Sequence, residues 1–377
     1  MRRSLLILAV ISIGLIFIKT GCKSPSKPET VAQEVMQRVY DEVKTPYKYG
    51  LILVPPHDTL KYDCPTVFFH ENKWHMTYVV FDGQGYETWL SESEDLLNWD
   101  IKGKIMSFNE DTTAWDRNQA AGYNSLQDLE WGGSYELQKF DNKYWLSYFG
   151  GNSTGYEKGL LSISMAFTEK SPIESIEWDR LGYPVLSTKD ENVRWWENSV
   201  MYKSSVIWDK ENLTGYPFLM YYNARGDSLQ PNRGAERIGI AGSHDMIHWD
   251  RFITEPLLNH HKGITGDAVI QKMGDLYVMF YFGAFWPGTE GISAWNRFAC
   301  SYDLVNWTDW NGAHLIEPTE EFDGRFAHKS FVIKHDGVVY HFYNAVNEKN
   351  QRGIAVATSK DMGKSNLEFG ESEGMPF

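Results

Sequence analysis

The sequence is poor in cysteine and has no excess of positive charge. Only 3 of its 377 residues are cysteine, and their spacing is not that of a metal site. The formal net charge of −14 argues against a nucleic-acid partner. After Ile18 the sequence has no second apolar run long enough to span a membrane. What the composition does supply is aromatic residues, 15% of the total with 15 tryptophans, and many of these rings must lie in a core.

The N-terminus has the pattern of an export signal. Arg2 and Arg3 precede an almost unbroken apolar run over residues 5–18, which is too short for a comfortable membrane span. Gly21 and Cys22 follow and resemble a bacterial lipobox, although Lys19 is an unusual residue there. We therefore expect residues 1–22 to be a lipoprotein signal peptide with Cys22 as the lipidation site. An uncleaved anchor helix is the alternative.

Export and tethering follow from either interpretation of the N-terminus. We expect the protein on the bacterial cell envelope, in the periplasm or on the outer-membrane surface, with the membrane as a partner through the lipid. With Cys22 lipidated, only Cys64 and Cys300 remain, and the sequence does not indicate whether they pair. Residues 23–47 form a polar tether and one amphipathic helix, which the apolar spacing predicts over residues 28–43. Thr45 and Pro46 end that helix.

Internal repetition predicts the architecture of residues 48–377. One phrase runs from a serine through an acidic and an apolar residue to a tryptophan, with near-identical copies at residues 93–99, 243–249 and 301–307. A weaker copy ends at Trp178, and a fifth begins at Ser359 and breaks off before its tryptophan. Recurrence of one phrase along a sequence is typical of repeat architectures.

A second phrase precedes each copy of the first and consists of an apolar strand, a tight turn and an aromatic strand. It covers residues 66–78, 135–148, 205–222, 268–281 and 330–343, with Asp-Asn, Gly-Asp or Asp-Gly at several turns. Five such units predict an all-β, five-bladed β-propeller. Residues 50–54 read as a strand that closes the ring against the last unit. A pair of β-sandwiches explains the strands but not their fivefold recurrence.

Residues just before the five inner strands should converge near the propeller axis. The sequence places there residues 61–65, 131–136, 195–198 with 202–204, 265–267 and 325–329. Several carboxylates, one histidine and many aromatics lie at these positions, which suits glycoside hydrolysis. That reaction needs one carboxylic acid to protonate the leaving oxygen and a second carboxylate to activate water or attack the sugar. Crowding of like charges keeps one of them protonated near neutral pH.

The repeated phrase, and Tyr62-Asp63-Cys64-Pro65 ahead of an apolar strand, resemble five-bladed glycosidases of glycoside hydrolase families 43, 32 and 117. The resemblance covers nearly all of the sequence after Lys48. It implies a first-blade Asp as general base, a second Asp that orients groups and tunes a pKa, and a Glu as general acid. Some family 117 members use a late His instead of that Glu. The resemblance implies inversion and no required cofactor, although some relatives hold a structural calcium ion on the axis.

Carried onto this sequence, the resemblance implies Asp63 as the general base. Asp267, Glu197 and His328 compete as acid and pKa modulator, with Glu136 behind them. Asp267 departs from the pattern because the fourth blade usually offers a Glu. Each residue also has a structural interpretation, as a turn, cap or solvated loop residue. The predicted substrate-binding residues are Trp131, Tyr135, Trp195, Trp196, Lys203 and Lys329.

Three functions remain open at this point. The leading hypothesis is an exported glycosidase that trims oligosaccharides or polysaccharides. A glycoside phosphorylase, for which the related family 130 is the precedent, would need cations near the acid, and Lys203, Arg225, Arg233 and Lys329 are available. A non-catalytic carbohydrate-binding propeller would need no acid pair. No metal site is predicted, since the loop setting of His260 and His261 favours a solvated turn.

Overall fold

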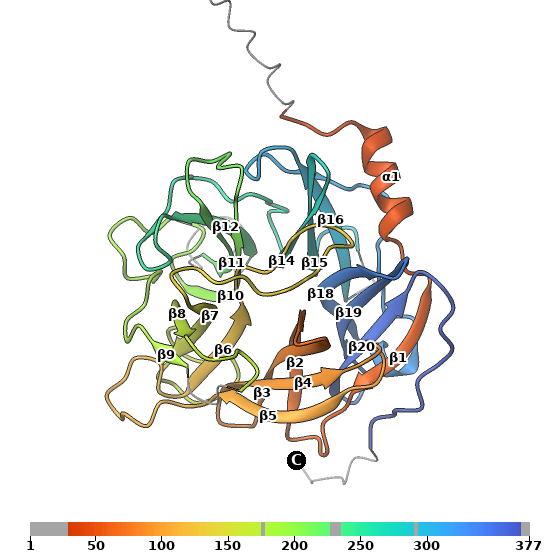
Figure 1. The fold of residues 1–377 in the computed structure, drawn as a ribbon, viewed down its shortest axis with the longest axis horizontal. Helices are drawn as coiled ribbons and strands as arrows, with labels where there is room; N and C mark the ends of the chain where they lie inside the picture. The colour runs from red at the N-terminus through yellow and green to blue at the C-terminus, as the bar shows by residue number, and fades with distance from the viewer. Residues whose placement is uncertain (1–28, 175–177, 227–234, 290–292, 371–377) are drawn as a thin grey trace, which may run out of the picture.

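The computed structural model describes residues 29–174, 178–226, 235–289 and 293–370. The predicted signal peptide and Cys22 lie outside the described residues. Nearly all elements are β-strands, and they are grouped in sheets around a common centre (Figure 1). Within the described residues, no helix has the length and apolar character needed to cross a membrane. Cys64 and Cys300 are both buried and unpaired.

The strands pair with their neighbours in chain order as antiparallel sheets. One four-stranded sheet contains β2 (Lys61–His70), β3 (Lys73–Phe81), β4 (Tyr86–Ser93) and β5 (Asp100–Met106). A second contains β6 (Gln119–Asn124), β7 (Tyr144–Gly151), β8 (Ser162–Thr168) and β9 (Asp179–Arg180). The last contains β18 (Phe326–His335), β19 (Val338–Val346), β20 (Arg352–Thr358) and β1 (Tyr47–Leu53).

The remaining strands form one larger sheet with two four-stranded halves. The first half contains β10 (Val200–Trp208), β11 (Phe218–Arg225), β12 (Glu236–Ser243) and β13 (Trp249–Asp250). The second contains β14 (Ile264–Met273), β15 (Leu276–Ala284), β16 (Ala294–Ser301) and β17 (Thr308–Asp309). A single parallel pair, Glu236 with Ile264, joins the halves. The arrangement is propeller-like, with the first strand of each group nearest the centre (Figure 1).

β1 brings an early segment of the sequence against the last strand group. It pairs antiparallel with β20, and Leu51 lies opposite Ala355. The sequence prediction that residues 50–54 close the ring against the last unit is therefore confirmed. This closure matters for the site because β20 carries a cavity residue, Arg352, at its first position.

The repeated serine-to-tryptophan phrase forms the same turn after the third strand in each of its clear copies. In the first copy, Ser93 Oγ accepts a hydrogen bond from Leu96 N at 2.9 Å, and Asp95 Oδ1 accepts one from Asn98 N at 2.8 Å. Leu96 has φ 68°, and Trp99 Nε1 donates to its carbonyl oxygen at 3.0 Å. The copies at Ser243 and Ser301 make the same bonds. The phrase therefore specifies a turn that the repeating unit reuses.

The N-terminal helix α1 (Gln33–Val43) packs on the outside of the sheets (Figure 1). Met36, Val39 and Val43 are buried in one cluster with apolar residues of β15, β16 and β19, and Tyr40 stacks on Trp310 at 5.2 Å. The helix begins later than the predicted residue 28. Residues 29–32 are not helical, and Val31 N donates to Thr308 Oγ1 at 2.8 Å, which ties this stretch to β17 instead.

The second unit differs from its prediction. Its inner strand is β6, whereas residues 135–140 were predicted to be that strand. Residues 125–143, which we call the crossing segment, run across the centre between β6 and β7 (Figure 1). The segment bonds to the other four inner strands: Tyr135 O accepts from Phe69 N, Val206 O from Leu126 N, Lys272 O from Trp131 N, and Tyr135 Oη from Lys334 N.

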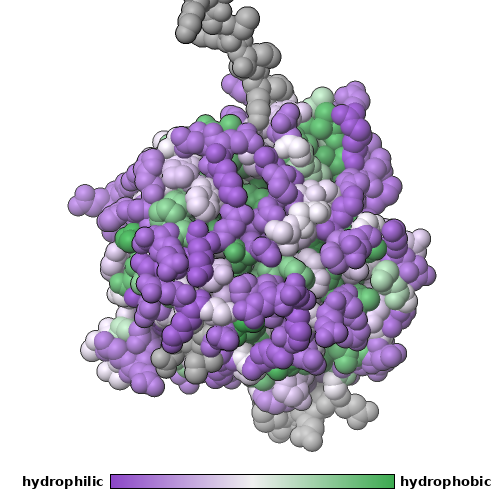
Figure 2. Space-filling view, in the orientation of Figure 1, coloured by the Kyte–Doolittle hydropathy of each residue, from purple (hydrophilic) through white to green (hydrophobic). Residues whose placement is uncertain are grey.

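The face seen in Figure 2, which has the orientation of Figure 1, is mostly hydrophilic. Its apolar residues are scattered in small groups and do not form one broad patch. The apolar surface is instead buried between neighbouring sheets, in clusters such as that of Trp145, Trp196 and Tyr222. Burial of this kind is the main stabilising contribution in a domain made of packed sheets.

Candidate functional site

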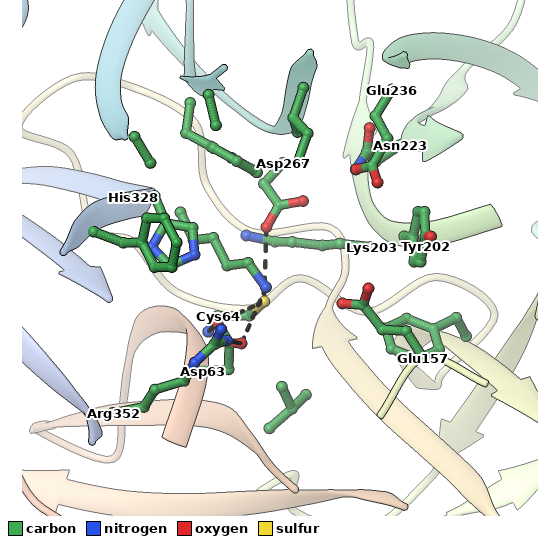
Figure 3. Close-up of a pocket in the computed structure, with 18 of the residues that line it drawn as sticks. Asp63, Cys64, Glu157, Tyr202, Lys203, Asn223, Glu236, Asp267, His328 and Arg352 are labelled. Carbon is green, nitrogen blue, oxygen red and sulfur yellow. Dashed lines mark hydrogen bonds and ion pairs between the residues drawn. The ribbon is translucent and has the colours of Figure 1, made fainter. Parts of the chain in front are cut away.

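A cavity of about 200 Å³ opens where the inner strands begin. Every group of strands contributes to its wall. The lining side chains include Asp63 and Cys64 from β2, Lys203 from β10, Asp267 from β14 and His328 from β18 (Figure 3). Tyr123 from β6 and Lys329 from β18 also line it. The predicted convergence is thus observed for the first, third, fourth and fifth units, although residues 195–198 of the third unit do not line the cavity. The second unit contributes through β6 rather than through residues 131–136.

A bulge near the start of four inner strands turns their side chains toward the cavity. The pairing register shifts between Asp63 and Thr66 in β2, and at the corresponding places in β10, β14 and β18. Such bulges re-aim side chains and are common beside functional sites. Three bulge residues have positive φ although none is glycine: Cys64 (50°), Asp267 (60°) and Lys329 (62°). This backbone conformation is unfavourable for such residues and is typical of constrained sites.

Asp63 is a buried carboxylate held by two cations. Its Oδ2 lies 3.0 Å from Lys329 Nζ and 3.0 Å from Arg352 Nη1, and Cys64 N donates to Oδ1 at 3.0 Å. Burial alone would raise the pKa of Asp63, but Lys329 and Arg352 outweigh it and hold that pKa well below its usual range. Asp63 is therefore ionised at any physiological pH.

Glu236 lies on the opposite side of the cavity from Asp63 (Figure 3). Burial, together with the nearby charge of Glu157, raises the pKa of Glu236 to about 7. Its Oε2 accepts a hydrogen bond from Asn223 Nδ2 at 3.0 Å. Burial also raises the pKa of Glu157, with Lys329 opposing that shift. The two glutamates therefore form an acid pair that retains a proton near neutral pH.

The cavity wall also includes three buried side chains, those of Asp267, Cys64 and Lys203. Asp267 is 4% exposed, and Cys64 Sγ lies 3.7 Å from its Oδ2. Lys203 is 3% exposed, its ammonium lies 5.6 Å from the centre of the Tyr123 ring, and it has no hydrogen-bonding partner among the described residues. An ammonium in that setting is free to bind a ligand.

His328 also lines the cavity and aligns with Asp63 by blade register, as the sequence indicated. Burial, reinforced by the neighbouring charge of Lys329, lowers the pKa of His328 to about 3. Its imidazole is therefore neutral near pH 7. A neutral ring is a poor proton donor, so the environment disfavours His328 as the general acid that the resemblance to family 117 implied.

Glu197 does not reach the cavity, which corrects its expected place among the catalytic candidates. It is fully buried, Arg251 Nε lies 2.5 Å from its Oε1, and Tyr222 Oη donates to its Oε2. Trp196 stacks on Tyr222 at 5.9 Å inside a hydrophobic cluster, and Trp195 lies outside under the Arg237 guanidinium. The two tryptophans and Glu197 precede β10, and none of the three lines the cavity.

Glu136, Tyr135 and Trp131 belong to the crossing segment, so their expected place at the site is also corrected. Glu136 is exposed, and Tyr135 is buried against the ends of the inner strands. Trp131 stacks on Phe280 and donates to Glu42 of α1 at 2.8 Å. All three lie at the ends of the inner strands, whereas the cavity lies at their beginnings.

Sequence reasoning missed Glu157, Glu236 and Arg352. Glu236 and Arg352 are the first residues of β12 and β20, the third strands of their groups. In an antiparallel group the first and third strands run the same way, so both begin at the cavity end. Applying the convergence argument to third strands would have found both residues. Glu157 lies in the loop between β7 and β8, at φ 49°, where no strand pattern marks it.

The described residues contain no group of three or more His, Cys, Asp or Glu side chains arranged to hold a metal ion. His260, half of the histidine pair noted in the sequence, stacks on Trp286 at 3.6 Å instead. The cavity thus offers acids, cations and aromatic walls. This set can transfer protons and hold a polyhydroxylated ligand.

Comparison with solved structures relates the fold and most of the sequence to known proteins. A structure described as a complex of BT0996 with RGII and another described as "Glycoside hydrolase" each share 51% identity with this protein. Each covers 92% of this protein and 100% of its own length, with a TM-score of 0.87. No protein-family model and no curated protein matches the sequence.

More distant structures share the fold alone. A thermostable family-43 glycoside hydrolase is 15% identical with a TM-score of 0.55, over 86% of this protein and 98% of its own length. A family 117 glycoside hydrolase from Zobellia galactanivorans is also 15% identical, with a TM-score of 0.59, over 84% of this protein and 91% of its own length. These are the folds that the sequence resemblance implied.

Proposed function

The protein belongs to the glycoside hydrolases, and on that premise we propose that it hydrolyses the bond to a terminal sugar with Glu236 as the general acid. The observation that carries this assignment is the pKa of Glu236, raised to about 7 beside a second glutamate in the cavity. A general acid works best when its pKa lies near the working pH, because a large fraction is then protonated and the proton is still readily donated. Glycosidic oxygen is a poor leaving group unless it is protonated.

We propose Glu157 as the carboxylate partner of Glu236. The charge of Glu157 raises the pKa of Glu236, and burial raises the pKa of both, so the pair holds one proton. During bond cleavage Glu236 donates its proton to the glycosidic oxygen. The ionised Glu157 then attacks the sugar or activates water. Asp63, predicted as the base, remains a candidate for that role. Its two cations, however, make it a weak base.

The stereochemistry of hydrolysis discriminates between these partners. Inversion, which the resemblance implied, needs a water molecule between widely separated carboxyl groups, and Asp63 lies across the cavity from Glu236 (Figure 3). Retention needs a close carboxylate, and of the carboxylates whose charge raises the pKa of Glu236, Glu157 has a larger effect than Asp267. The anomeric configuration of the first released sugar, followed by NMR within seconds to minutes, reports which pair operates.

For the substrate, we propose a carbohydrate of the kind bound by the 51% identical relative, whose structure is described as a complex with RGII. A cavity of about 200 Å³ suits the end of a sugar polymer better than its middle. The phosphorylase alternative has weaker support. Lys203 lines the cavity without a hydrogen-bonding partner among the described residues, and the charge of Arg225 acts on Glu236. Lys329, however, is engaged by Asp63, and Arg233 lies outside the described residues.

We further propose an organisation for the whole protein. Residues 1–22 are a lipoprotein signal peptide and Cys22 carries the lipid. Residues 23–47 are a tether with its helix, and residues 48–377 are a five-bladed propeller whose blades are the five strand groups described above. The protein would then be exported and anchored to the cell envelope, where oligosaccharides are met. Radiolabelled palmitate should label the wild type and not Cys22→Ala.

The function is tested on protein that lacks residues 1–22, using RGII fragments and a panel of aryl glycosides, with and without phosphate. Glu236→Gln should lose most activity on natural linkages and far less on 2,4-dinitrophenyl glycosides, because that leaving group needs no proton. Glu157→Gln should lose activity on both. Equal losses for Glu236→Gln on both substrate types would refute its role as the acid, and a strict phosphate requirement would make the enzyme a phosphorylase.

A further inference from the structure

Five residues that line the cavity carry a buried polar atom without a hydrogen-bonding partner among the described residues: Tyr123, Lys203, Asn223, His328 and Arg352. Two of these atoms, the ammonium of Lys203 on β10 and Oδ1 of Asn223 on β11, lie on neighbouring strands. Each side chain is 3% exposed and lines the cavity. Figure 3 shows Lys203 extended across the cavity toward Asp267. Buried polar groups without a partner are rare in proteins, and they are costly to the free energy of folding.

The chemistry of this set discriminates between ligand types. An ammonium only donates hydrogen bonds, whereas Asn223 Oδ1 and a carboxylate at Asp267 only accept them. A sugar hydroxyl both donates and accepts, so adjacent hydroxyls satisfy the whole set. A carboxylate or phosphate group of a ligand would meet the ammonium favourably but would face the oxygens of Asn223 and Asp267. The set therefore fits a neutral, hydroxyl-bearing ring.

Asn223 is also fixed relative to the candidate acid. Its Nδ2 donates to Glu236 Oε2 at 3.0 Å, which assigns Oδ1 as the free end of the amide. Gly266 lies against this amide so closely that an added Cβ would come within 2.8 Å of both Oδ1 and Cγ. A hydroxyl bound at Oδ1 is consequently held close to the acid that must protonate the scissile bond.

We infer that Lys203 and Asn223 form a hydroxyl-binding floor for the terminal sugar, and that Lys203 is a specificity-determining residue that selects a neutral sugar with a free hydroxyl at that position. The inference rests on the proposed glycosidase function. The ammonium has no hydrogen-bonding partner among the described residues, and a hydroxyl of the correct sugar supplies one. A site with buried polar groups rejects analogues that leave those groups unpaired.

Lys203→Met tests the floor, with Lys272→Met as a matched control. Lys272 is also on an inner strand, but it is paired with Glu130 and Glu211 at 3.1 and 2.9 Å, away from the cavity. On the best neutral substrate, the kcat/KM value for Lys203→Met should fall on the order of 10- to 150-fold, the factor for one hydrogen bond to a charged group. Lys272→Met should leave kcat/KM unchanged.

Mono-deoxy versions of that substrate locate the contact without depending on any variant. The wild type should discriminate strongly against one deoxy position, and Lys203→Met should show little further loss at that position, so that the two losses are not additive. Normal kcat/KM in Lys203→Met, or additive losses at every position, would overturn the inference. So would selective loss of an acidic substrate, which would indicate an anion site. Absence of wild-type activity on every substrate would instead refute the proposed function.

Discussion

Lys329 Nζ lies 3.0 Å from Asp63 Oδ2, and Arg352 Nη1 lies 3.0 Å from the same oxygen. One buried carboxylate thus holds two cations that come from β18 and β20. The arrangement joins the first strand group to the last at the cavity wall. Asp63 consequently has a role in assembling the site whether or not it also activates water.

Asp63→Asn should lower the free energy of unfolding by about 3–5 kcal/mol, because both cations would remain buried without their counter-charge. The pKa of Asp63 is depressed in the folded protein, so its contribution is complete above the unfolded pKa of about 3.9 and is lost as pH falls toward the folded pKa. Urea unfolding at pH 7 and pH 3 measures both effects. Asp41→Asn, at an exposed ion pair with Lys44, is the control and should change nothing measurable. Unaltered stability of Asp63→Asn would contradict the ion-pair account.

The pH dependence of kcat/KM should show an alkaline limb near pH 7. Glu236 must be protonated to act as the acid, and its pKa is raised to about 7, so activity should decline as pH rises through that value. The limb should be much weaker on 2,4-dinitrophenyl glycosides, whose leaving group needs no proton, and absent from the residual activity of Glu236→Gln. Asn223→Asp is a useful second variant because an added negative charge beside Glu236 should shift the limb upward. A limb that stays in place in Glu236→Gln would assign it to another group.

His328 should contribute no ionisation to the pH profile above about pH 5. Its pKa is lowered to about 3 by burial and by Lys329, so the ring stays neutral across the working range. His328→Gln retains a neutral polar group, and we expect the midpoint of each limb to be unchanged even if kcat falls. A limb between pH 5 and 8 that disappears in His328→Gln would restore this residue as a proton donor.

The strand pattern predicted most of the fold but misplaced one unit. Asp141 and Asn142 do form a turn, at φ 52° and 58°, with Phe140 paired to Lys143. The stretch before that turn, however, makes only isolated bridges, with Glu136 paired to Phe69 and Leu137 to Gln127. The true inner strand, β6, contains two alanines and a glycine at residues 120–122, whose small side chains lack the aromatic and β-branched character expected of a strand. Tertiary packing around the axis decides this unit, and the local pattern cannot reveal it.

The site was predicted in part for the same reason. Asp63, Asp267 and Lys329 were found because all three lie at the starts of inner strands. Predicting Glu236 would have required the same argument for third strands. Predicting Glu157 would have required the conformation of the loop between β7 and β8. The opposite error concerns Glu197, which was predicted to be catalytic. It lies beside two tryptophans, but it forms a buried ion pair with Arg251.

Glu197, the acid of that ion pair, should contribute to stability and not to chemistry. Glu197→Gln leaves Arg251 buried next to a neutral amide, and the expected loss in the free energy of unfolding is about 3–5 kcal/mol. At 25 °C, kcat should remain within roughly a factor of two of the wild-type value in the folded fraction. Asp190→Asn, at the more exposed partner of Arg251, is the matched control and should cost less. If stable Glu197→Gln lost activity by roughly two orders of magnitude, this acid would return to the catalytic set.

The crossing segment should act as a structural closure at the end of the axis opposite the cavity. Tyr135 Oη accepts hydrogen bonds from Gly132 N and Lys334 N, both at 2.9 Å, so Tyr135→Phe should lower the free energy of unfolding by about 1–3 kcal/mol. Because the cavity lies at the other ends of the strands, kcat/KM should not change. Tyr183→Phe, at a half-exposed ring, controls for loss of a hydroxyl. If Tyr135→Phe instead reduced kcat/KM with stability intact, the segment would be coupled to the site, and the expectation that Tyr135 binds substrate would regain support.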